Sequence, residues 1–391
     1  MNAPRKPTTH VCLVSEQVTP NLTPVLDPAT APRRVRLVVS PDMTGRAAWL
    51  SQVLAPRGIR VEQWTVSDPW DVEQVQLRTL ELLEAERDAV AGGAIALNVT
   101  GGTKPMAIAA YEAFRAYDLP IFYVHPRHDR LIWMHPADRP AVDLANRVGL
   151  DDFLAAHGSR VLRRADDAVP PPLGQLTDWL VAQNVRIERS LATLNWLAHG
   201  AERDLRSPRL EPHQLRDAGL SELIGHFADQ GLVQIDGERL RFPDEAARFF
   251  VNGGWLEAHA YDLLRRLRGE LGQIQDLARS VDIARANERG DPVPNELDVA
   301  CLAENRLYII ECKTRRWGDG AAFGPGADAL YRLDALADLL GGLQAQAMLV
   351  SYRALPANVQ ERAANLRIHT CAGARLPELP TILRQWIAPT P

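Results

Sequence analysis

Hydrophobic residues in the first third of the chain form short apolar runs, separated by longer stretches with helical spacing. The runs predict buried strands at residues 10–15, 34–40, 61–66, 94–99, 119–124 and 130–134. Residues 72–91 carry Leu and Val at helical spacing and predict one long helix, whereas the polar residues 15–26 predict a loop. Because strands alternate with helices, we expect a parallel, Rossmann-like sheet with helices on both faces.

The middle of the chain has a different pattern. Residues 165–174, ADDAVPPPLG, predict a linker, and residues 177–199 have the apolar spacing of a helix. Residues 220–250 predict a helix, a turn, two short strands and a helix, which is the outline of a winged-helix domain. Such a domain can bind duplex DNA, but its recognition helix carries Glu222 and Asp229 and no Lys or Arg that could reach a base. We therefore favour a connector or dimerisation role.

The last third of the chain predicts an α/β domain around a β-hairpin. The expected elements are a helix capped by Asn252 with Leu256, Leu263 and Leu267 on its core face, strands at 280–286, 296–303, 306–313, 345–351 and 367–370, and a helix at 327–340 after the Gly-rich segment 318–326. Glu304 and Asn305 form the hairpin turn, where Asn tolerates a left-handed backbone. The chain is thus expected to be an α/β protein with a Rossmann-like domain at 1–165, a helical and winged-helix connector at 166–250 and an α/β domain at 251–391.

The register of this hairpin places Asp298 opposite Glu311, and Glu296 opposite Lys313. Directly opposed side chains on antiparallel strands lie ~5 Å apart at Cβ, where like charges are destabilising. A divalent cation between Asp298 and Glu311 would remove the repulsion, and Lys313 projects from the same face as Glu311. Two carboxylates and an ammonium group are the equipment of metal-assisted phosphodiester hydrolysis. The alternative is a solvated strand end with an ion pair between Glu296 and Lys313.

The composition narrows the class of protein. A length of 391 residues predicts two or three domains, and 46% hydrophobic with 24% charged residues is ordinary for a soluble globular protein. The N-terminus has no signal-peptide pattern and no apolar run approaches 18 residues, so we expect a cytoplasmic protein without a membrane span. The four cysteines are scattered without a C-x-x-C pair, which argues against a zinc site or disulfides. A net charge of -5 disfavours broad non-specific duplex binding.

Residues 98–106, NVTGGTKPM, lie between a predicted strand and a predicted helix. Ligands of parallel sheets bind at this position, where free N–H groups at the start of the helix attract phosphate. The two glycines allow close backbone approach, and the polar groups are two hydroxyls and one ammonium group, from Thr100, Thr103 and Lys104. The stretch matches neither the P-loop nor the dinucleotide-binding pattern. The alternative is a Gly-rich turn with Pro105 near the first helical position.

These loop residues, N-x-T-G-G-T-K-x-M, and the strand-loop VSEQVTPNLTP at residues 14–24 resemble the CARF domain, the CRISPR-associated Rossmann fold that senses cyclic oligoadenylates. The resemblance covers roughly residues 9–160. It implies a homodimer in which the two loops face their counterparts across a twofold axis, with a ring-shaped nucleotide, expected to be cyclic tetra-adenylate, between them. The ligand contacts that it implies are Ser15, Gln17, Asn21, Thr100, Gly101, Gly102, Thr103 and Lys104.

An acid on one strand and E-x-K on the next, here Asp298, Glu311 and Lys313, resemble the core of PD-(D/E)XK nucleases, although no Pro-Asp dipeptide precedes the site. In that family a glutamate on the helix before the hairpin often joins the metal site, which implies a role for Glu257. Asp298, Glu311, Glu257 and the backbone carbonyl of Cys312 are then expected to hold Mn²⁺ or Mg²⁺, because these hard ions prefer oxygen ligands. Lys313 is expected to position the attacking water or to neutralise charge on the phosphate.

The GGWLE, NELDV, ECK and AMLVS segments, following the TGGTK loop, resemble CARF-linked PD-(D/E)XK effectors. This implies an endonuclease of type III CRISPR antiviral defence that cyclic oligoadenylate activates and that cleaves RNA and/or DNA. Two alternatives stay open. One is a ligand-controlled winged-helix transcription regulator with a non-catalytic C-terminal domain. The other is a helical HEPN-type ribonuclease, suggested by an R-x6-H match at 362–369 that lacks the expected helical surroundings.

Overall fold

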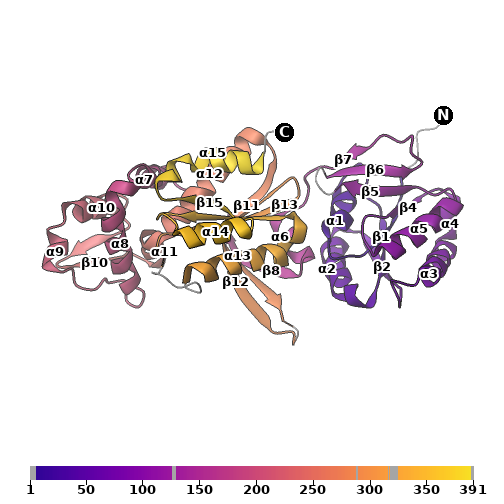
Figure 1. The fold of residues 1–391 in the computed structure, drawn as a ribbon, viewed down its shortest axis with the longest axis horizontal. Coiled ribbons are helices and arrows are strands. Elements are labelled where there is room, and N and C mark those ends of the chain that lie inside the picture. Colours follow the sequence, from indigo (N-terminus) through magenta and orange to yellow (C-terminus); the bar gives the residue numbers. More distant parts are fainter. Residues whose placement is uncertain (1–5, 126–128, 288, 316, 318–324, 389–391) are drawn as a thin grey trace.

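The structure, a computed structural model, describes residues 6–125, 129–287, 289–315, 317 and 325–388. The molecule is elongated, with an N-terminal α/β unit at one end and a small helical unit at the other (Figure 1). The C-terminal part of the chain forms a second α/β unit between them, so the first and last thirds of the sequence lie side by side (Figure 1). Within the described residues, no helix combines the length and the apolarity that crossing a membrane requires.

The N-terminal unit contains a seven-stranded sheet with the order β3-β2-β1-β4-β5-β6-β7. Its strands are β1 (Thr9–Leu13), β2 (Arg34–Val39), β3 (Arg60–Thr65), β4 (Ile95–Asn98), β5 (Ile121–His125), β6 (Arg130–His135) and β7 (Val142–Asp143). The strands from β1 to β5 are parallel, and β6 and β7 add an antiparallel edge. The predicted Rossmann-like sheet is confirmed, and its strand order reverses between β1 and β4.

Helices cover both faces of this sheet. They are α1 (Thr19–Leu26), α2 (Thr44–Leu54), α3 (Val72–Ala85), α4 (Arg87–Ala91), α5 (Lys104–Ala116) and α6 (Leu150–Ala156). Val11 and Leu13 pack in the cluster of α3 and α5, whereas Cys12 between them packs in the cluster of α1, α2 and α6, as alternation along a strand requires. The predicted loop at residues 15–26 is wrong from Thr19 onward, where α1 begins. Pro20 stands in the first turn of this helix, where a missing N–H costs nothing.

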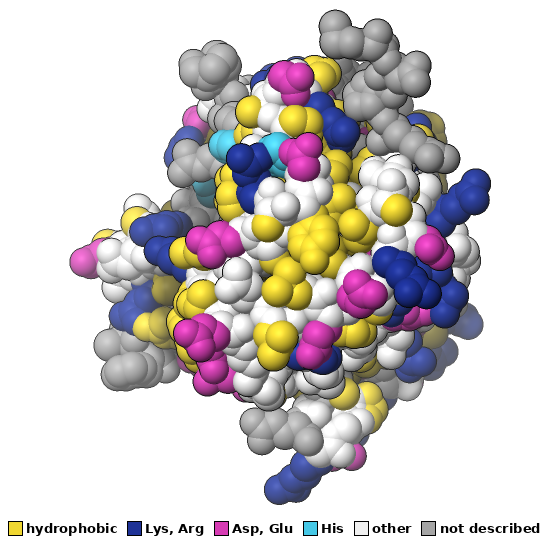
Figure 2. All heavy atoms as spheres, turned by 90° about the vertical axis from the view of Figure 1, so that its right-hand side faces the viewer, with side chains coloured by type: hydrophobic (Ala, Val, Ile, Leu, Met, Phe, Trp, Pro, Cys, Tyr) yellow, Lys and Arg dark blue, Asp and Glu magenta, His cyan; other side chains and the backbone are white. Residues whose placement is uncertain are grey.

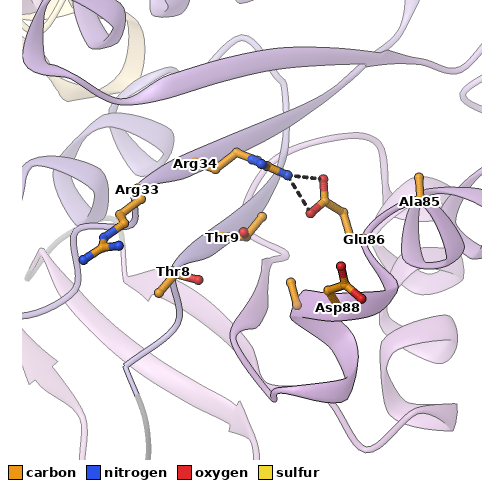
Figure 3. A pocket seen from close by; sticks show the side chains of 8 residues that line it. Thr8, Thr9, Arg33, Arg34, Ala85, Glu86 and Asp88 are labelled. Carbon is orange, nitrogen blue, oxygen red and sulfur yellow. Dashed lines mark hydrogen bonds and ion pairs between the residues drawn. The ribbon is translucent and has the colours of Figure 1, made fainter.

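The predicted single helix at residues 72–91 is divided at Glu86. The carboxylate of Glu86 is buried and accepts a hydrogen bond from Arg34 Nη1 at 2.9 Å (Figure 3). It also accepts one from Arg36 Nε at 2.6 Å. These two arginines stand on β2, so the ion pairs hold Glu86 against the sheet between α3 and α4. The pocket beside Glu86, lined by Thr8 and Arg33 among others, opens at the amino ends of the strands, away from the loops that follow β1 and β4.

The connector is a helical unit with a two-stranded wing. Its elements are α7 (Pro171–Ala182), α8 (Asn184–Gly200), α9 (Pro212–Leu215), α10 (Ala218–Asp229), β9 (Gln234–Asp236), β10 (Arg239–Arg241) and α11 (Glu245–Phe249). The winged-helix outline of residues 220–250 is confirmed, with β9 and β10 antiparallel. The linker prediction is wrong beyond Pro170, because the prolines that follow it begin α7, and the predicted helix at 177–199 is split at Gln183.

The second α/β unit has a six-stranded mixed sheet with the order β15-β14-β13-β12-β11-β8. Its elements are β8 (Ser159–Ala165), α12 (Trp255–Leu271), β11 (Ile274–Ala286), β12 (Pro292–Ala303), β13 (Arg306–Lys313), α13 (Pro325–Gly341), β14 (Ala345–Ser351), α14 (Ala357–Asn365), β15 (His369–Ala372) and α15 (Leu379–Ile387). Strand β8 pairs with β11, so residues 159–165, grouped with the first domain on sequence, lie in the second sheet.

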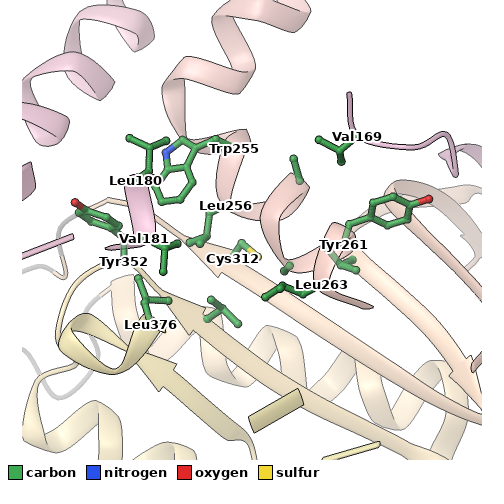
Figure 4. Packing of buried hydrophobic residues seen from close by; sticks show 14 of the residues in the cluster. Val169, Leu180, Val181, Trp255, Leu256, Tyr261, Leu263, Cys312, Tyr352 and Leu376 are labelled. Atoms are coloured by element: carbon green, nitrogen blue, oxygen red, sulfur yellow. The ribbon is translucent and has the colours of Figure 1, made fainter. Parts of the chain in front are cut away.

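Two buried clusters sandwich the second sheet. On one face, Trp255 and Leu256 of α12 pack with Cys312 of β13 and with the connector residue Leu180 (Figure 4). On the other face, α13 and α14 join a cluster that continues without a break into α1, α2 and α6 of the N-terminal unit. The two α/β units therefore share one hydrophobic core, and a change at their junction is felt by both because such cores are close-packed.

Candidate functional site

The predicted hairpin is confirmed. Strands β12 and β13 pair with the expected register, for example Val299 with Ile310, and Glu304 and Asn305 form the turn with φ angles of 49° and 54°. Beyond the last paired residues, Val299 and Ile310, a side chain replaces the backbone pairing. Asp298 Oδ2 accepts a hydrogen bond from the backbone N–H of Cys312 at 2.7 Å.

Glu257 reaches the same place from the first turn of α12. Gly253, with φ of 122°, lies in a short π-helical turn just before α12, and a Cβ on this residue would overlap the hydroxyl of Thr314. The glycine lets the chain approach the end of β13 closely and sets the first turn of α12 over it. The predicted cap at Asn252 is wrong, because Gly254 occupies the N-cap position and Asn252 lies within the π turn.

The acidic groups of this site have unfavourable electrostatics. Burial raises the pKa of the Glu257 carboxyl, and the nearby charges of Asp298, Glu296 and Glu311 raise it further. Burial also raises the pKa of Asp298, and Glu311 adds to the rise, against the hydrogen bond from Cys312. Burial alone would lower the pKa of Lys313, but the attraction of Glu311 and Asp298 outweighs it and raises that pKa. The cluster therefore carries more negative charge than its own cation balances.

Glu311 is held by two cations. It is 3% exposed, and its Oε1 lies 2.5 Å from Lys313 Nζ and 3.3 Å from Arg332 Nη2, which α13 contributes. Ser280 also faces the site, with its Oγ 3.5 Å from Glu257 Oε2. The structure thus brings together the four residues that the sequence predicted as catalytic candidates, and the contact with Ser280 is an addition that no local pattern indicated.

The donor chemistry of the site fits a hard divalent ion. Three carboxylates from α12, β12 and β13 converge there, and the excess negative charge that raises the pKa values of Glu257 and Asp298 is what a cation relieves. Across the described part of the chain, however, no three His, Cys, Asp or Glu side chains are already arranged as a metal-ligating group. Glu311 in particular is turned toward its two cations rather than toward the other acids.

A second site lies at the carboxyl ends of β1 and β4, where the strand order of the first sheet reverses. A cavity of about 730 Å³ opens there, which is within the ~300–1,000 Å³ of typical ligand pockets. Its lining includes four of the predicted ligand contacts, Ser15, Gln17, Thr100 and Gly102. The other lining residues are Glu16, Pro20 and Tyr123 of the N-terminal unit and Arg306, Leu343 and Gln344 of the second α/β unit.

Asn21 does not reach this cavity. It is 1% exposed, its Nδ2 donates to the carbonyl of Leu13 at 2.8 Å, and its Oδ1 accepts from Asn98 Nδ2 at 2.9 Å. Asn98 Nδ2 also donates to the carbonyl of Pro20 at 2.8 Å. That carbonyl needs an outside donor because Pro24, one helical turn later in α1, has no N–H. Asn21 and Asn98 therefore fix the two loops to each other, and Asn21 is a positioning residue rather than a ligand contact.

The remaining residues of the TGGTK loop shape the start of α5. Thr103 is the N-cap, because its hydroxyl accepts from the backbone N–H of Met106 at 3.2 Å, and Lys104 is the first helical residue. A Cβ on Gly101 would overlap the carbonyl oxygen of Leu13, so only glycine permits this contact between the two loops. The sequence thus predicted the loop and the helix that follows it. That Tyr123 on β5 also lines the cavity could not be predicted, because it depends on the order of the strands in the sheet.

The R-x6-H match does not form a site of its own. Arg362 lies on α14 with its guanidinium 5.1 Å from the centre of the Tyr331 ring, and His369 begins β15. The surrounding elements are those of the mixed sheet, so the structure does not support the helical ribonuclease alternative.

Two protein-family models match this chain, one in its N-terminal part and one in its C-terminal part. The family model described as the Card1 CARF domain matches residues 9–153, and the model described as the Card1-like endonuclease domain matches residues 244–390. A search of curated proteins returns no match.

Solved structures show the same arrangement over nearly the whole chain. Protein VC1899 from Vibrio cholerae is 31% identical over 97% of both chains, with a TM-score of 0.86. Can2 from Sulfobacillus thermosulfidooxidans, solved with cyclic tetra-adenylate, is 27% identical over 97% of this chain and 99% of its own, with a TM-score of 0.79. A type III CRISPR defence DNA nuclease activated by cyclic oligoadenylate shares the fold at 22% identity and a TM-score of 0.53, over 90% of this chain and 47% of its own.

Proposed function

The chain belongs to the Card1 family and is a cyclic-oligoadenylate-activated nuclease, and we propose that its cleavage is metal-dependent and that it acts as a homodimer. In this family a CARF domain is joined to an endonuclease domain. The endonuclease match also speaks against the transcription regulator with a non-catalytic C-terminal domain. RNA, DNA or both are the proposed substrates.

The observation that carries the catalytic proposal is the convergence of Glu257, Asp298 and Glu311 beside Lys313, in a buried place where the acids repel each other. Asp298, Glu311 and Glu257, with the backbone carbonyl of Cys312, would hold Mn²⁺ or Mg²⁺. The ion supplies a bound water of lowered pKa and charge stabilisation at the phosphate.

The other steps belong to the side chains. Lys313 remains protonated because Glu311 and Asp298 raise its pKa, so it acts as a cation that orients the water or neutralises the developing phosphate charge. Arg332, half exposed and in contact with Glu311, is placed to receive a second phosphate oxygen of the substrate. The ion pair between Glu311 and Lys313 has to open for Glu311 to serve as a ligand, which makes this arrangement a low-activity one.

The sensor proposal rests on the cavity after β1 and β4. Ser15, Gln17 and Thr100 offer hydrogen-bonding groups there, Gly102 allows close backbone approach, and Lys104 starts α5 beside them. The helix start and its lysine favour phosphate. By analogy with Can2, whose solved complex contains cyclic tetra-adenylate, this ring is the proposed activator.

The dimer proposal rests on an apolar surface of the CARF domain. Figure 2, which faces the end of that domain, shows hydrophobic side chains gathered on it. Trp70, Leu77, Ile108 and Tyr117, on or beside α3 and α5, are each more than half exposed. Gathered apolar side chains are typical of interaction surfaces. Ile108 stands one helical turn from Lys104, so a partner on this surface would lie next to the nucleotide loops.

The experiment incubates the purified protein with labelled RNA, single-stranded DNA and duplex DNA, each with and without cyclic tetra- or hexa-adenylate and Mn²⁺. We expect cleavage only when both the nucleotide and the metal are present, and we expect Lys313→Ala to abolish it while nucleotide binding remains. Sequence-specific duplex binding by a wild-type protein that never cleaves would instead support the transcription regulator. Unchanged activation of Lys104→Ala would remove that lysine from the sensor.

A further inference from the structure

The nucleotide cavity is not built by the CARF domain alone. Arg306, the first residue of β13, lines it together with Leu343 and Gln344 of the short 3-10 turn Gly342–Gln344 before β14. All three belong to the endonuclease domain. The 3-10 turn meets the CARF loop directly, because a Cβ on Gly342 would lie 3.0 Å from Gln17 Nε2.

The three side chains offer what one adenylate requires. Arg306 carries a guanidinium group, which interacts with the Tyr308 hydroxyl in this structure and is of the kind that pairs with phosphate. The Oε1 atom of Gln344 is buried and has no hydrogen-bond partner among the described residues. It can therefore accept a hydrogen bond from a ligand group such as the adenine amino group. Leu343 is 90% exposed beside the same cavity, where an apolar side chain can cover the face of a base.

The wall that these residues form is firmly fixed to both domains. The amide of Asn305, next to Arg306, donates from Nδ2 to Asp129 and, at 3.2 Å, to Asn146 Oδ1, both of the CARF domain. Gln275 of β11 completes the contact, with its Oε1 accepting from the backbone N–H of Asn305 at 2.9 Å. The tip of the catalytic hairpin is therefore seated in the CARF domain beside the nucleotide cavity.

The same strand leads from the cavity to the cutting site. Glu311 lies five residues after Arg306 on β13, a span of about 17 Å at ~3.3 Å per residue. The residues between them are buried, including Tyr308, Ile309 and Ile310, and β13 is flanked by β12 and β14. Close-packed interiors transmit strain, so we expect a displacement of Arg306 at one end of β13 to reach the Glu311 carboxylate near the other end.

We propose that the activating nucleotide is contacted directly by the endonuclease domain of the same chain, through Arg306, Leu343 and Gln344, and that β13 carries this contact to Glu311 and Lys313. The inference rests on the proposed function, since it presupposes that the cavity binds a cyclic oligoadenylate. It gives the regulation a physical basis, because a ligand shifts an equilibrium only through contacts that differ between the two arrangements.

The direct test is photocross-linking of the full-length protein with cyclic tetra-adenylate that carries 8-azidoadenine, followed by peptide mass spectrometry. We expect cross-linked peptides that contain Arg306 or Leu343–Gln344, in addition to those of the CARF loops. Excess unmodified cyclic tetra-adenylate should suppress both sets. Cross-links restricted to CARF peptides would overturn the inference.

Titration of variants supplies a second test. Arg306→Ala and Gln344→Ala should each raise both the dissociation constant for cyclic tetra-adenylate and the concentration that half-activates cleavage. We expect roughly 10- to 100-fold for the arginine, from the loss of a charge-assisted contact, and less for the glutamine. Arg265→Ala, which removes an exposed arginine on α12 of the same domain, is the matched control and should behave as wild type.

The outcomes separate the two proposals. If wild-type protein is activated and both cavity variants bind and respond as it does, the nuclease-domain contact is refuted while the proposed function stands. If wild-type protein neither binds nor responds to cyclic tetra- or hexa-adenylate, the proposed function itself fails. Circular dichroism and melting curves verify that each variant is folded. Gln344→Ala, at the end of the short turn Gly342–Gln344, keeps the test decisive if Arg306→Ala does not fold.

Discussion

Gly253→Ala probes the close approach that places Glu257 over the end of β13. The substitution puts a Cβ on a residue with φ of 122°, which costs about 1–3 kcal/mol in backbone strain. The new methyl group would also overlap the Thr314 hydroxyl and lie 3.2 Å from Thr314 Cβ, and overpacking of this kind typically costs about 1–3 kcal/mol. We therefore expect the free energy of unfolding to fall by about 2–6 kcal/mol.

The assay is urea unfolding followed by circular dichroism, with Gly269→Ala, near the end of α12, as the matched control. Gly269 has open space where a Cβ would be added, so its replacement should be neutral or stabilise the protein by up to about 1 kcal/mol. Adding Thr314→Ala to the Gly253→Ala variant should restore the stability lost to the overlap with the Thr314 hydroxyl, but not the stability lost to backbone strain. If Gly253→Ala lies within about 0.5 kcal/mol of wild type, the account of how α12 is positioned is wrong.

Two further predictions follow from carboxyls with raised pKa values. Burial and neighbouring acids raise the pKa of Glu257 above its ordinary 4.5, so the stability that its protonated form provides is present below pH 4.5 and is lost as pH rises. Glu257→Gln should therefore raise the melting temperature in EDTA at pH 8, although it should reduce cleavage. A lower melting temperature for this variant would contradict the prediction. Burial raises the pKa of Asp129 from 3.8 to about 6, so its stabilising contribution is lost as pH rises from about 4 through 6. Asp129→Asn keeps an acceptor for Asn305 and should stabilise the protein by about 2–3 kcal/mol at pH 8 and hardly at all at pH 3.5, which unfolding curves at the two pH values would measure.

Local patterns were sufficient for most of the fold because each predicted element depends on its own neighbours in sequence. The hairpin register followed from a two-residue turn, since Glu304 and Asn305 fix which residues oppose each other. The TGGTK loop was recognisable because its glycines, hydroxyl groups and lysine stand together in sequence. The helices that were missed or divided, at α1 and at Glu86, depend instead on partners far away, such as the arginines of β2.

The sites were less predictable where they depend on tertiary contacts. Asn21 has a polar side chain of the kind that contacts ligands, but its amide group is hydrogen-bonded to Leu13 and Asn98. Only the packing of the two loops reveals these bonds. Arg306 and Gln344 are more than 280 residues from Ser15 in sequence and carry no motif. Their place in the nucleotide cavity follows from the packing of the second α/β unit against the first, which no local pattern encodes.

The central claim is that cleavage of nucleic acid requires the Glu311 carboxylate on β13 and is activated by nucleotide binding at the CARF domain. It is tested most directly by the rate at which Glu311→Ala cleaves labelled RNA and DNA with saturating cyclic tetra-adenylate and Mn²⁺, beside wild type and the exposed control Glu361→Ala on α14. We predict that Glu311→Ala loses cleavage by about 100-fold or more while it binds the nucleotide as tightly as wild type, and that Glu361→Ala cleaves normally. Cleavage by Glu311→Ala at the wild-type rate would contradict the account.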